Sequence, residues 1–194
     1  MNCSRRWFLT LLATLPAWGA PEQRVHKIFK AWKDGPGGSV GVVHKGRLIF
    51  AQGFGLADIS NKLPNTPQTN FDLASLSKQF TATTILLADQ EGKLALSDPI
   101  SRFLPGLPSY AAGVRVEQLL GMVSGLPEYD DTQPASLKDL IATLQAEGPT
   151  FRAGERYEYL NMNYALLTFI AAKAHGKSLG AVLRERVDRR AAAA

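Results

Sequence analysis

A helix that is apolar on most of its sides is predicted after Ser75, and the rest of the chain must cover such a helix. Gly92 supplies a C-terminal stop for this helix. The apolar positions between these two residues are Phe80, Ala82, Ile85, Leu86, Leu87 and Ala88. We therefore expect the start of the helix, including Lys78, to be buried and held away from bulk water.

Ser75 and Lys78 lie three residues apart at the start of this helix. Side chains at positions i and i+3 point the same way, so the Lys78 amine can lie against the Ser75 oxygen. A serine hydroxyl becomes a nucleophile when a base removes its proton, and burial near a positive helix end lowers the pKa of an amine. Ser77 falls on another face and is the weaker nucleophile candidate. On its own, the Ser-x-x-Lys pattern more often marks a capped helix, because serine is a favoured N-cap residue.

Two β-rich runs before this helix predict an antiparallel hairpin. They are residues 39–44 (SVGVVH) and 47–52 (RLIFAQ), and only Lys45 and Gly46 separate them, as is typical of a two-residue hairpin turn. A short helix is expected before them, at residues 24–33, and residues 61–70 predict a surface loop because they are rich in Pro, Asn and Thr. Further helices are expected at residues 116–123, 137–147 and 164–175.

Residues 1–20 predict an export signal, because two arginines precede an apolar run that is too short to span a membrane comfortably. The stretch SRRWFL, with Arg5 and Arg6, resembles a twin-arginine signal; a general secretory signal with two arginines is the alternative. Either route predicts a periplasmic or secreted protein with no membrane span after cleavage. The single cysteine, Cys3, would be removed with the signal, leaving no disulfide, thiol nucleophile or thiolate metal site.

The charge distribution argues against nucleic acid as a partner. The chain of 194 residues carries a formal net charge of +5. Its basic residues are scattered, with no run that alternates with aromatic residues. Length and composition predict one ordinary globular domain with a sizeable core.

A second motif, Tyr159-Leu160-Asn161, stands just before the predicted helix at residues 164–175. Alone, it would be an aromatic packing residue followed by a helix cap. With Ser75 and Lys78 it has a different meaning. The two motifs, their order and their flanking sequences resemble the serine β-lactamase and penicillin-binding superfamily, in particular the class C β-lactamase-like branch with its related peptidases and esterases. The resemblance covers residues 37–57, 71–104, 119–127 and 151–167.

The resemblance implies an α/β (α+β) sandwich, in which an antiparallel sheet with flanking helices accompanies a mainly helical region. Residues 21–78 would supply the hairpin and the nucleophile segment, and residues 79–194 the helical region. It also implies a serine hydrolase in which Ser75 forms an acyl-enzyme while Lys78 and Tyr159 share the acceptance of its proton. A phenol next to an ammonium has a lowered pKa and becomes a usable base. Asn161 would bind the substrate's amide carbonyl and help to hold Lys78, and no metal or other cofactor is implied.

The chain departs from the family pattern at a third motif, Lys or His followed by Thr or Ser and then Gly, which the sequence lacks. We interpret the near misses at His44 and His175 as solvated surface residues. The family takes one N–H of its oxyanion hole and its remaining sheet strands from that later region. This implies an incomplete domain, with the C-terminal sheet strands missing and the hairpin partly uncovered. Met122 and Val123 also replace the usual His-Thr pair before Ser-Gly-Leu.

The leading hypothesis is an exported serine hydrolase represented by an N-terminal portion, with little or no turnover. A β-lactam, a cell-wall peptide and an ester all stay open as the small-molecule substrate, and the oligomeric state is not predicted. The rival hypothesis is a non-catalytic truncated remnant or an exported binding module. A third hypothesis, an unrelated exported helical domain, requires both motifs to be coincidental.

Overall fold

The computed structural model describes residues 21–132 and 135–188. The predicted export signal with Arg5, Arg6 and Cys3, and the run of residues 189–194, lie outside the described residues. Contacts divide the chain into two compact units, one ending at Asp72 and the other beginning at Leu73. The sequence-based division grouped Ser75 and Lys78 with the hairpin in residues 21–78, whereas this boundary places both residues in the second unit.

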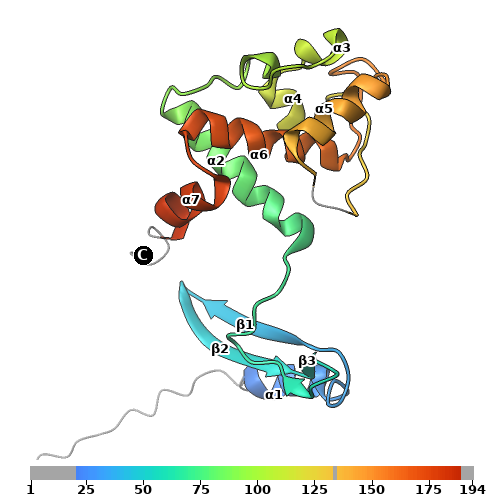
Figure 1. Cartoon of the computed structure of the whole chain (residues 1–194). Coiled ribbons are helices and arrows are strands. Elements are labelled where there is room, and N and C mark those ends of the chain that lie inside the picture. Colours follow the sequence, from blue (N-terminus) through green and yellow to red (C-terminus); the bar gives the residue numbers. More distant parts are fainter. Residues whose placement is uncertain (1–20, 133–134, 189–194) are drawn as a thin grey trace, which may run out of the picture. The chain divides into compact units, whose positions relative to one another are not determined.

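The first unit contains the predicted hairpin, formed by β1 (Gly38–His44) and β2 (Arg47–Phe54) in antiparallel pairing (Figure 1). Lys45 and Gly46 have φ angles of 48° and 74°, and two consecutive positive φ values are what a type I′ hairpin turn requires. Helix α1 (Pro21–Phe29) confirms the predicted short helix, although it ends earlier. Its Phe29 ring stacks on the Phe54 ring of β2 at a centroid distance of 4.9 Å, so the helix packs on this strand.

The expected surface loop at residues 61–70 is partly wrong. Two short strands, β3 (Leu56–Asp58) and β4 (Leu63–Pro64), pair with each other, and Asn65 beside them is buried. The Asn65 backbone N–H donates to the carbonyl of Gly55 at 2.9 Å, and its side-chain amide donates to the carbonyl of Phe54 at 3.0 Å. Long-range hydrogen bonds therefore hold a polar segment whose composition alone indicated a loop.

The second unit is helical. It begins with the 3₁₀ turn η1 (Ala74–Ser77), which continues directly into α2 (Lys78–Gln90). The predicted helices at residues 116–123, 137–147 and 164–175 are confirmed as α4 (Val116–Leu120), α5 (Leu137–Ala146) and α6 (Asn161–His175). Shorter elements were not predicted: η2 (Ile100–Arg102), α3 (Ser109–Ala112), α7 (Leu179–Leu183) and the π-helical turn η3 (Arg184–Asp188).

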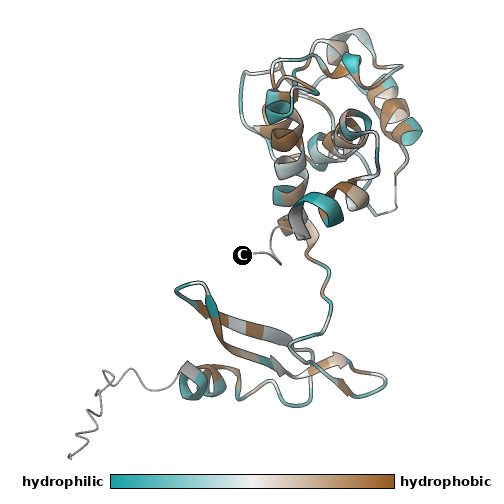
Figure 2. Cartoon of the chain, turned by 90° about the vertical axis from the view of Figure 1, so that its left-hand side faces the viewer, coloured by the Kyte–Doolittle hydropathy of each residue, from teal (hydrophilic) through white to brown (hydrophobic). Residues whose placement is uncertain are grey.

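The core of this unit forms where α6 lies alongside α2, and α4, α5 and α7 also contact α6 (Figure 1). Figure 2 colours the ribbon by hydropathy and shows hydrophobic segments, in brown, on the helices of this unit. Completely buried members of the core include Ile85, Leu119, Leu144, Leu166, Leu167 and Ile170. Helix α6 ends at Gly176, whose φ of 64° gives the left-handed C-cap for which glycine is suited.

The prediction that α2 is covered on most sides is wrong. Its buried residues are Thr81, Thr84, Ile85 and Ala88, which share one helical face, whereas Leu86 is 51% exposed. The helix start is also more accessible than expected, since Ser75 is exposed and Lys78 is half-buried. Among the described residues, no helix has the length and apolar character needed to cross a membrane.

His175 is not the solvated residue that the sequence suggested. It is half-buried, and its Nε2 lies 2.9 Å from the Thr84 carbonyl of α2. Because a carbonyl only accepts, Nε2 donates this hydrogen bond, which ties the end of α6 to α2. His44, by contrast, is exposed at the end of β1, in agreement with the prediction.

Candidate active site

Ser75 sits in the 3₁₀ turn η1, on a chain that turns sharply just before it. Ala74 has a φ of 44°, in the left-handed region that non-glycine residues rarely adopt. Such a backbone conformation costs on the order of 1 kcal/mol, and strained residues of this kind are often found at functional sites. No serine side chain caps α2: Ser77 is the N-cap residue without a capping hydrogen bond, and its hydroxyl donates to the Ala74 carbonyl. The alternative of a serine-capped helix is therefore wrong here.

Lys78, the first residue of α2, lies against Ser75 as the i, i+3 spacing predicted. Its Nζ donates to Ser75 Oγ at 3.0 Å and to Asn161 Oδ1 at 2.7 Å. The ammonium also lies 4.9 Å from the ring centroid of Tyr159 and 5.9 Å from that of Tyr164, within the range of cation–π attraction. Three neighbours besides Ser75 thus hold this amine in place.

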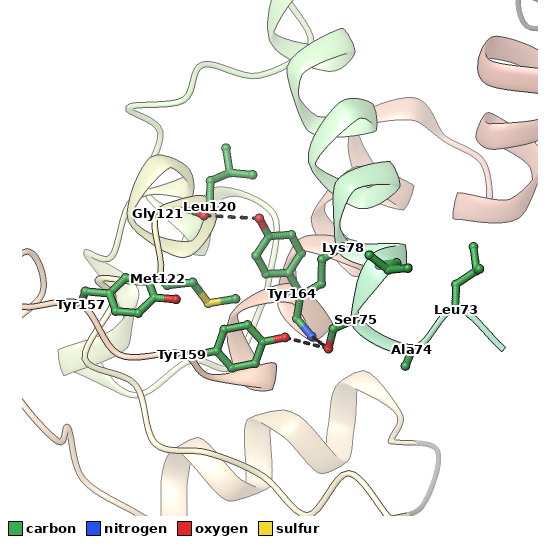
Figure 3. Close-up of a pocket in the computed structure, with 11 residues that line it drawn as sticks. Leu73, Ala74, Ser75, Lys78, Leu120, Gly121, Met122, Tyr157, Tyr159 and Tyr164 are labelled. Carbon is green, nitrogen blue, oxygen red and sulfur yellow. Dashed lines mark hydrogen bonds between the residues drawn. The ribbon is translucent and has the colours of Figure 1, made fainter. Parts of the chain in front are cut away.

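Tyr159 approaches Ser75 from the segment that precedes α6. Its hydroxyl donates to Ser75 Oγ at 2.7 Å, and Figure 3 shows Tyr159 and Lys78 converging on this atom. The Lys78 amine beside the phenol is the main cause that lowers the pKa of Tyr159, and the hydrogen bond with Ser75 adds to it. Burial and the negative charge of Glu128 act in the opposite direction. A phenol in this setting loses its proton more readily than an ordinary tyrosine.

Asn161 joins this group from the first position of α6. Its side-chain oxygen accepts from Lys78, and its Nδ2 donates to Asp131 Oδ2 at 2.7 Å. Its backbone N–H and that of Met162 donate to the two carboxylate oxygens of Glu128, at 2.6 and 2.9 Å. The alternative that Asn161 is a helix cap is wrong, because Leu160 holds the N-cap position. The structure thus brings all four predicted residues together.

A pocket of about 640 Å³ opens beside Ser75 (Figure 3). Sequence reasoning missed most of its wall, which consists of apolar and aromatic side chains from η1, α4 and α6 and their flanking segments. The residues concerned are Leu73, Leu76, Leu120, Met122, Tyr157 and Tyr164. Burial raises the pKa of Tyr164, and its hydroxyl donates to the Leu120 carbonyl at 3.3 Å. Glu128 and Asp131 were also missed, because acidic residues in a loop carry no periodic signal.

Met122, which departs from the family's usual His-Thr pair, is buried in the pocket wall with a φ of 56°. Its Sδ lies 3.2 Å from Nδ2 of the buried Asn163, whose Oδ1 accepts a short hydrogen bond from Ser124. The resemblance implies polar residues at this position, whereas the structure has an apolar side chain whose sulfur is a weak acceptor for the Asn163 amide. In the described part of the chain, no group of three or more His, Cys, Asp and Glu residues could hold a metal ion.

Comparisons with known proteins agree on one family. The family model described as Beta-lactamase matches residues 25–191. Penicillin-binding protein 4* of Bacillus subtilis (strain 168) is 36% identical over 151 residues, which make up 73% of this chain and 33% of that protein. The chain spans about a third of the length of the curated relatives that it matches.

Solved structures also match the fold, including the following two. The octameric penicillin-binding protein homologue from Pyrococcus abyssi has a TM-score of 0.72 at 28% identity, covering 86% of this chain and 41% of that one. A class C beta-lactamase has a TM-score of 0.70 at 30% identity, covering 86% of this chain and 45% of that one. These matches confirm the fold class expected from the resemblance, over the part of the fold that the chain covers.

Proposed function

The chain belongs to the beta-lactamase family, and on that basis we propose that it is a serine hydrolase whose nucleophile is Ser75. One observation carries this proposal: Ser75 Oγ has both Lys78 Nζ, at 3.0 Å, and the Tyr159 hydroxyl, at 2.7 Å, within hydrogen-bond distance. A nucleophile with a base in contact, and a third group that orients the base, is the arrangement that covalent catalysis needs. Asn161 is the third group, through its contact with Lys78.

In the proposed reaction, Ser75 Oγ attacks the carbonyl carbon of a β-lactam, a cell-wall peptide or an ester. The Ser75 proton passes to the Tyr159 phenolate or, where the Lys78 amine has itself lost its proton, to Lys78. Once Tyr159 has lost its proton, its oxygen accepts a hydrogen bond from the Ser75 hydroxyl instead of donating one. The substrate's C–N or C–O bond breaks, and the leaving group takes a proton from the same pair. Water then hydrolyses the acyl-enzyme, and the scheme uses no metal.

Substrate binding would involve Asn161 and the pocket wall. Asn161 would donate to an amide carbonyl of the substrate. The apolar and aromatic wall with Leu120, Met122 and Tyr157 suits an apolar acyl group. We expect slow turnover by the 194-residue chain, since its sequence holds no Lys/His-Thr/Ser-Gly motif to supply the second oxyanion N–H, and losing one such donor typically costs about 10²–10³ in rate. The export signal predicted at residues 1–20 supports action in the periplasm or outside the cell.

Labelling with a tagged penicillin and with a p-nitrophenyl ester, followed by mass spectrometry, tests this proposal. We expect a covalent adduct on Ser75 that is absent from Ser75→Ala and present in the control Ser77→Ala, whose hydroxyl contacts the Ala74 carbonyl instead. If neither probe labels Ser75 even at high concentration, the hydrolase proposal fails for this chain. A non-catalytic remnant or binding module would then be the better description.

A further inference from the structure

The orientation of the Asn161 side chain is decided by its two charged neighbours. An amide has an oxygen that accepts on one side and two N–H bonds that donate on the other, and its shape is nearly the same either way round. Asp131, as a carboxylate, only accepts and lies 2.7 Å from Nδ2; the Lys78 ammonium only donates and lies 2.7 Å from Oδ1. The reversed amide would place oxygen against the carboxylate and N–H against the ammonium, and both contacts would be repulsive.

Glu128 fixes the backbone from which this side chain extends. The first N–H groups of a helix have no partner within the helix. Glu128 accepts from the first two of them in α6, on Asn161 at 2.6 Å and on Met162 at 2.9 Å. A negative charge at this end of a helix is also favoured by the helix dipole. Both carboxylates come from the segment after Leu126 and Pro127, and together they hold Asn161 by backbone and by side chain.

We propose that Asp131 and Glu128 are positioning residues of the proposed hydrolase, which fix the Asn161 amide so that its oxygen holds Lys78 against Ser75. This inference rests on the proposed function. Three hydrogen bonds in series, of 2.7, 2.7 and 3.0 Å, connect Asp131 through Asn161 and Lys78 to Ser75 Oγ. One N–H of Asn161 is given to Asp131, so a single N–H remains for a substrate carbonyl. Without Asp131, only the contact with Lys78 still orients the Asn161 amide, so the oxygen that positions Lys78 is held less firmly.

The first test is an NMR measurement that requires no activity. In the full chain labelled with ¹⁵N and ¹³C, we expect one Asn161 Nδ2 proton to be shifted downfield and to exchange slowly with water. Asp131→Ala should abolish this signature, and Asp131→Asn should restore part of it, since an amide oxygen can still accept. The matched control is Asp130→Ala: the adjacent carboxylate accepts from the Thr132 N–H at 3.0 Å, so the Asn161 signal should stay unchanged. An Asn161 signal that is the same in Asp131→Ala as in the wild type would overturn the proposal.

The second test measures the rate at which Ser75 is labelled. A misplaced group near a reacting atom typically costs up to about 100-fold in rate. We expect Asp131→Ala to lower the maximal labelling rate by about 10- to 100-fold with a much smaller change in the half-saturating probe concentration, and Asp130→Ala to stay within about twofold. Equal losses in the two variants would contradict positioning by Asp131. If the wild-type chain is not labelled, the proposed function fails, and the NMR measurement still decides whether Asp131 orients Asn161.

Glu128 is tested through the same two measurements. Glu128→Gln keeps one acceptor for the two N–H groups, and we expect it to broaden or shift the backbone signals of Asn161 and Met162 and to slow labelling. Glu155→Gln is the control, because the Glu155 carboxylate accepts from the Arg152 N–H at 3.2 Å, away from the two N–H groups that Glu128 binds. Unchanged Asn161 and Met162 signals in Glu128→Gln would remove Glu128 from the proposal.

Discussion

The Tyr159 hydroxyl lies 2.7 Å from Oγ of Ser75, although 84 positions separate the two residues in the chain. Ser75 Oγ also accepts a hydrogen bond from Lys78, which lies three residues further along the chain. The same oxygen therefore accepts one local and one long-range hydrogen bond. The long-range contact depends on the packing of α6 against α2, which brings the segment before α6 to the start of α2.

Replacing Tyr159 by Phe should slow acylation of Ser75 by about 10²-fold or more, because a positioned general base contributes 10²–10⁴-fold. The measurement is the rate of adduct formation with a tagged penicillin or a p-nitrophenyl ester. Tyr110→Phe is the control, because the Tyr110 hydroxyl donates to the Leu144 carbonyl at 2.6 Å and does not line the Ser75 pocket. This variant should be slightly less stable than the wild type and should react with the probe at the wild-type rate. If Tyr159→Phe were acylated at the wild-type rate, Tyr159 would not be the general base, and Lys78 would be the remaining candidate for accepting the Ser75 proton.

Acylation should become faster with rising pH, with a midpoint below the ordinary tyrosine value of 10.0, because the Lys78 amine lowers the pKa of Tyr159. In the proposed mechanism, the Tyr159 phenolate is the active form. The charge of Glu128 raises the pKa of Tyr159. Glu128→Gln should therefore move the midpoint to lower pH, and Lys78→Met should move it to higher pH. The ¹³C NMR titration of the Tyr159 ring measures the same shifts without a substrate, and a Glu128→Gln midpoint that moves upward would refute the assignment.

Asn163→Ala should lower the free energy of unfolding by about 1–3 kcal/mol, since it leaves the buried Ser124 hydroxyl without its acceptor. Urea unfolding of Asn163→Ala, Ser124→Ala and the double variant measures the coupling between the two side chains. We expect the double variant to be less destabilised than the sum of the single variants, by at least about 0.5 kcal/mol. Strict additivity would mean that the two side chains do not act as a pair.

Ser136→Ala should destabilise the protein by about 1 kcal/mol, because the Ser136 hydroxyl accepts from the Asp139 N–H at the start of α5. The Ser136 hydroxyl and backbone N–H also donate to the Asp139 carboxylate, and these hydrogen bonds lower the pKa of Asp139. A lowered folded-state pKa means that the ionised Asp139 stabilises the fold above its ordinary value of 3.8. This contribution is lost as the pH falls through the folded-state pKa.

Thermal unfolding of the wild type and Asp139→Asn across the acid range measures this loss. The two proteins should differ in stability near neutral pH and converge in acid. Ser136→Thr, which keeps a capping hydroxyl, serves as the control for Ser136→Ala. A stability difference between wild type and Asp139→Asn that does not change with pH would contradict the proposed linkage.

Local patterns predicted much of the fold. The hairpin around Lys45 and Gly46 and the helices α4, α5 and α6 follow from turn chemistry and hydrophobic spacing over a few residues. The contact of Lys78 with Ser75 follows from helical geometry, which any helix at that position would produce. The predictions that failed concern burial: α2 is covered on one face, Asn65 is held in a packed segment, and His175 binds α2.

The sequence by itself determined the candidate pair Ser75 and Lys78, the family resemblance and the residue types of the four candidate positions, because these are properties of short segments and their order. Only the tertiary structure decided which of these groups are in contact. In the structure, the Tyr159 hydroxyl binds Ser75 Oγ and the Asn161 oxygen binds Lys78. Asp131 and Glu128 form hydrogen bonds with Asn161 at the start of α6. The physical reason is that a hydrogen bond depends on the distance and direction between two atoms. Between residues 30 or more positions apart, the packing of the helices sets that geometry.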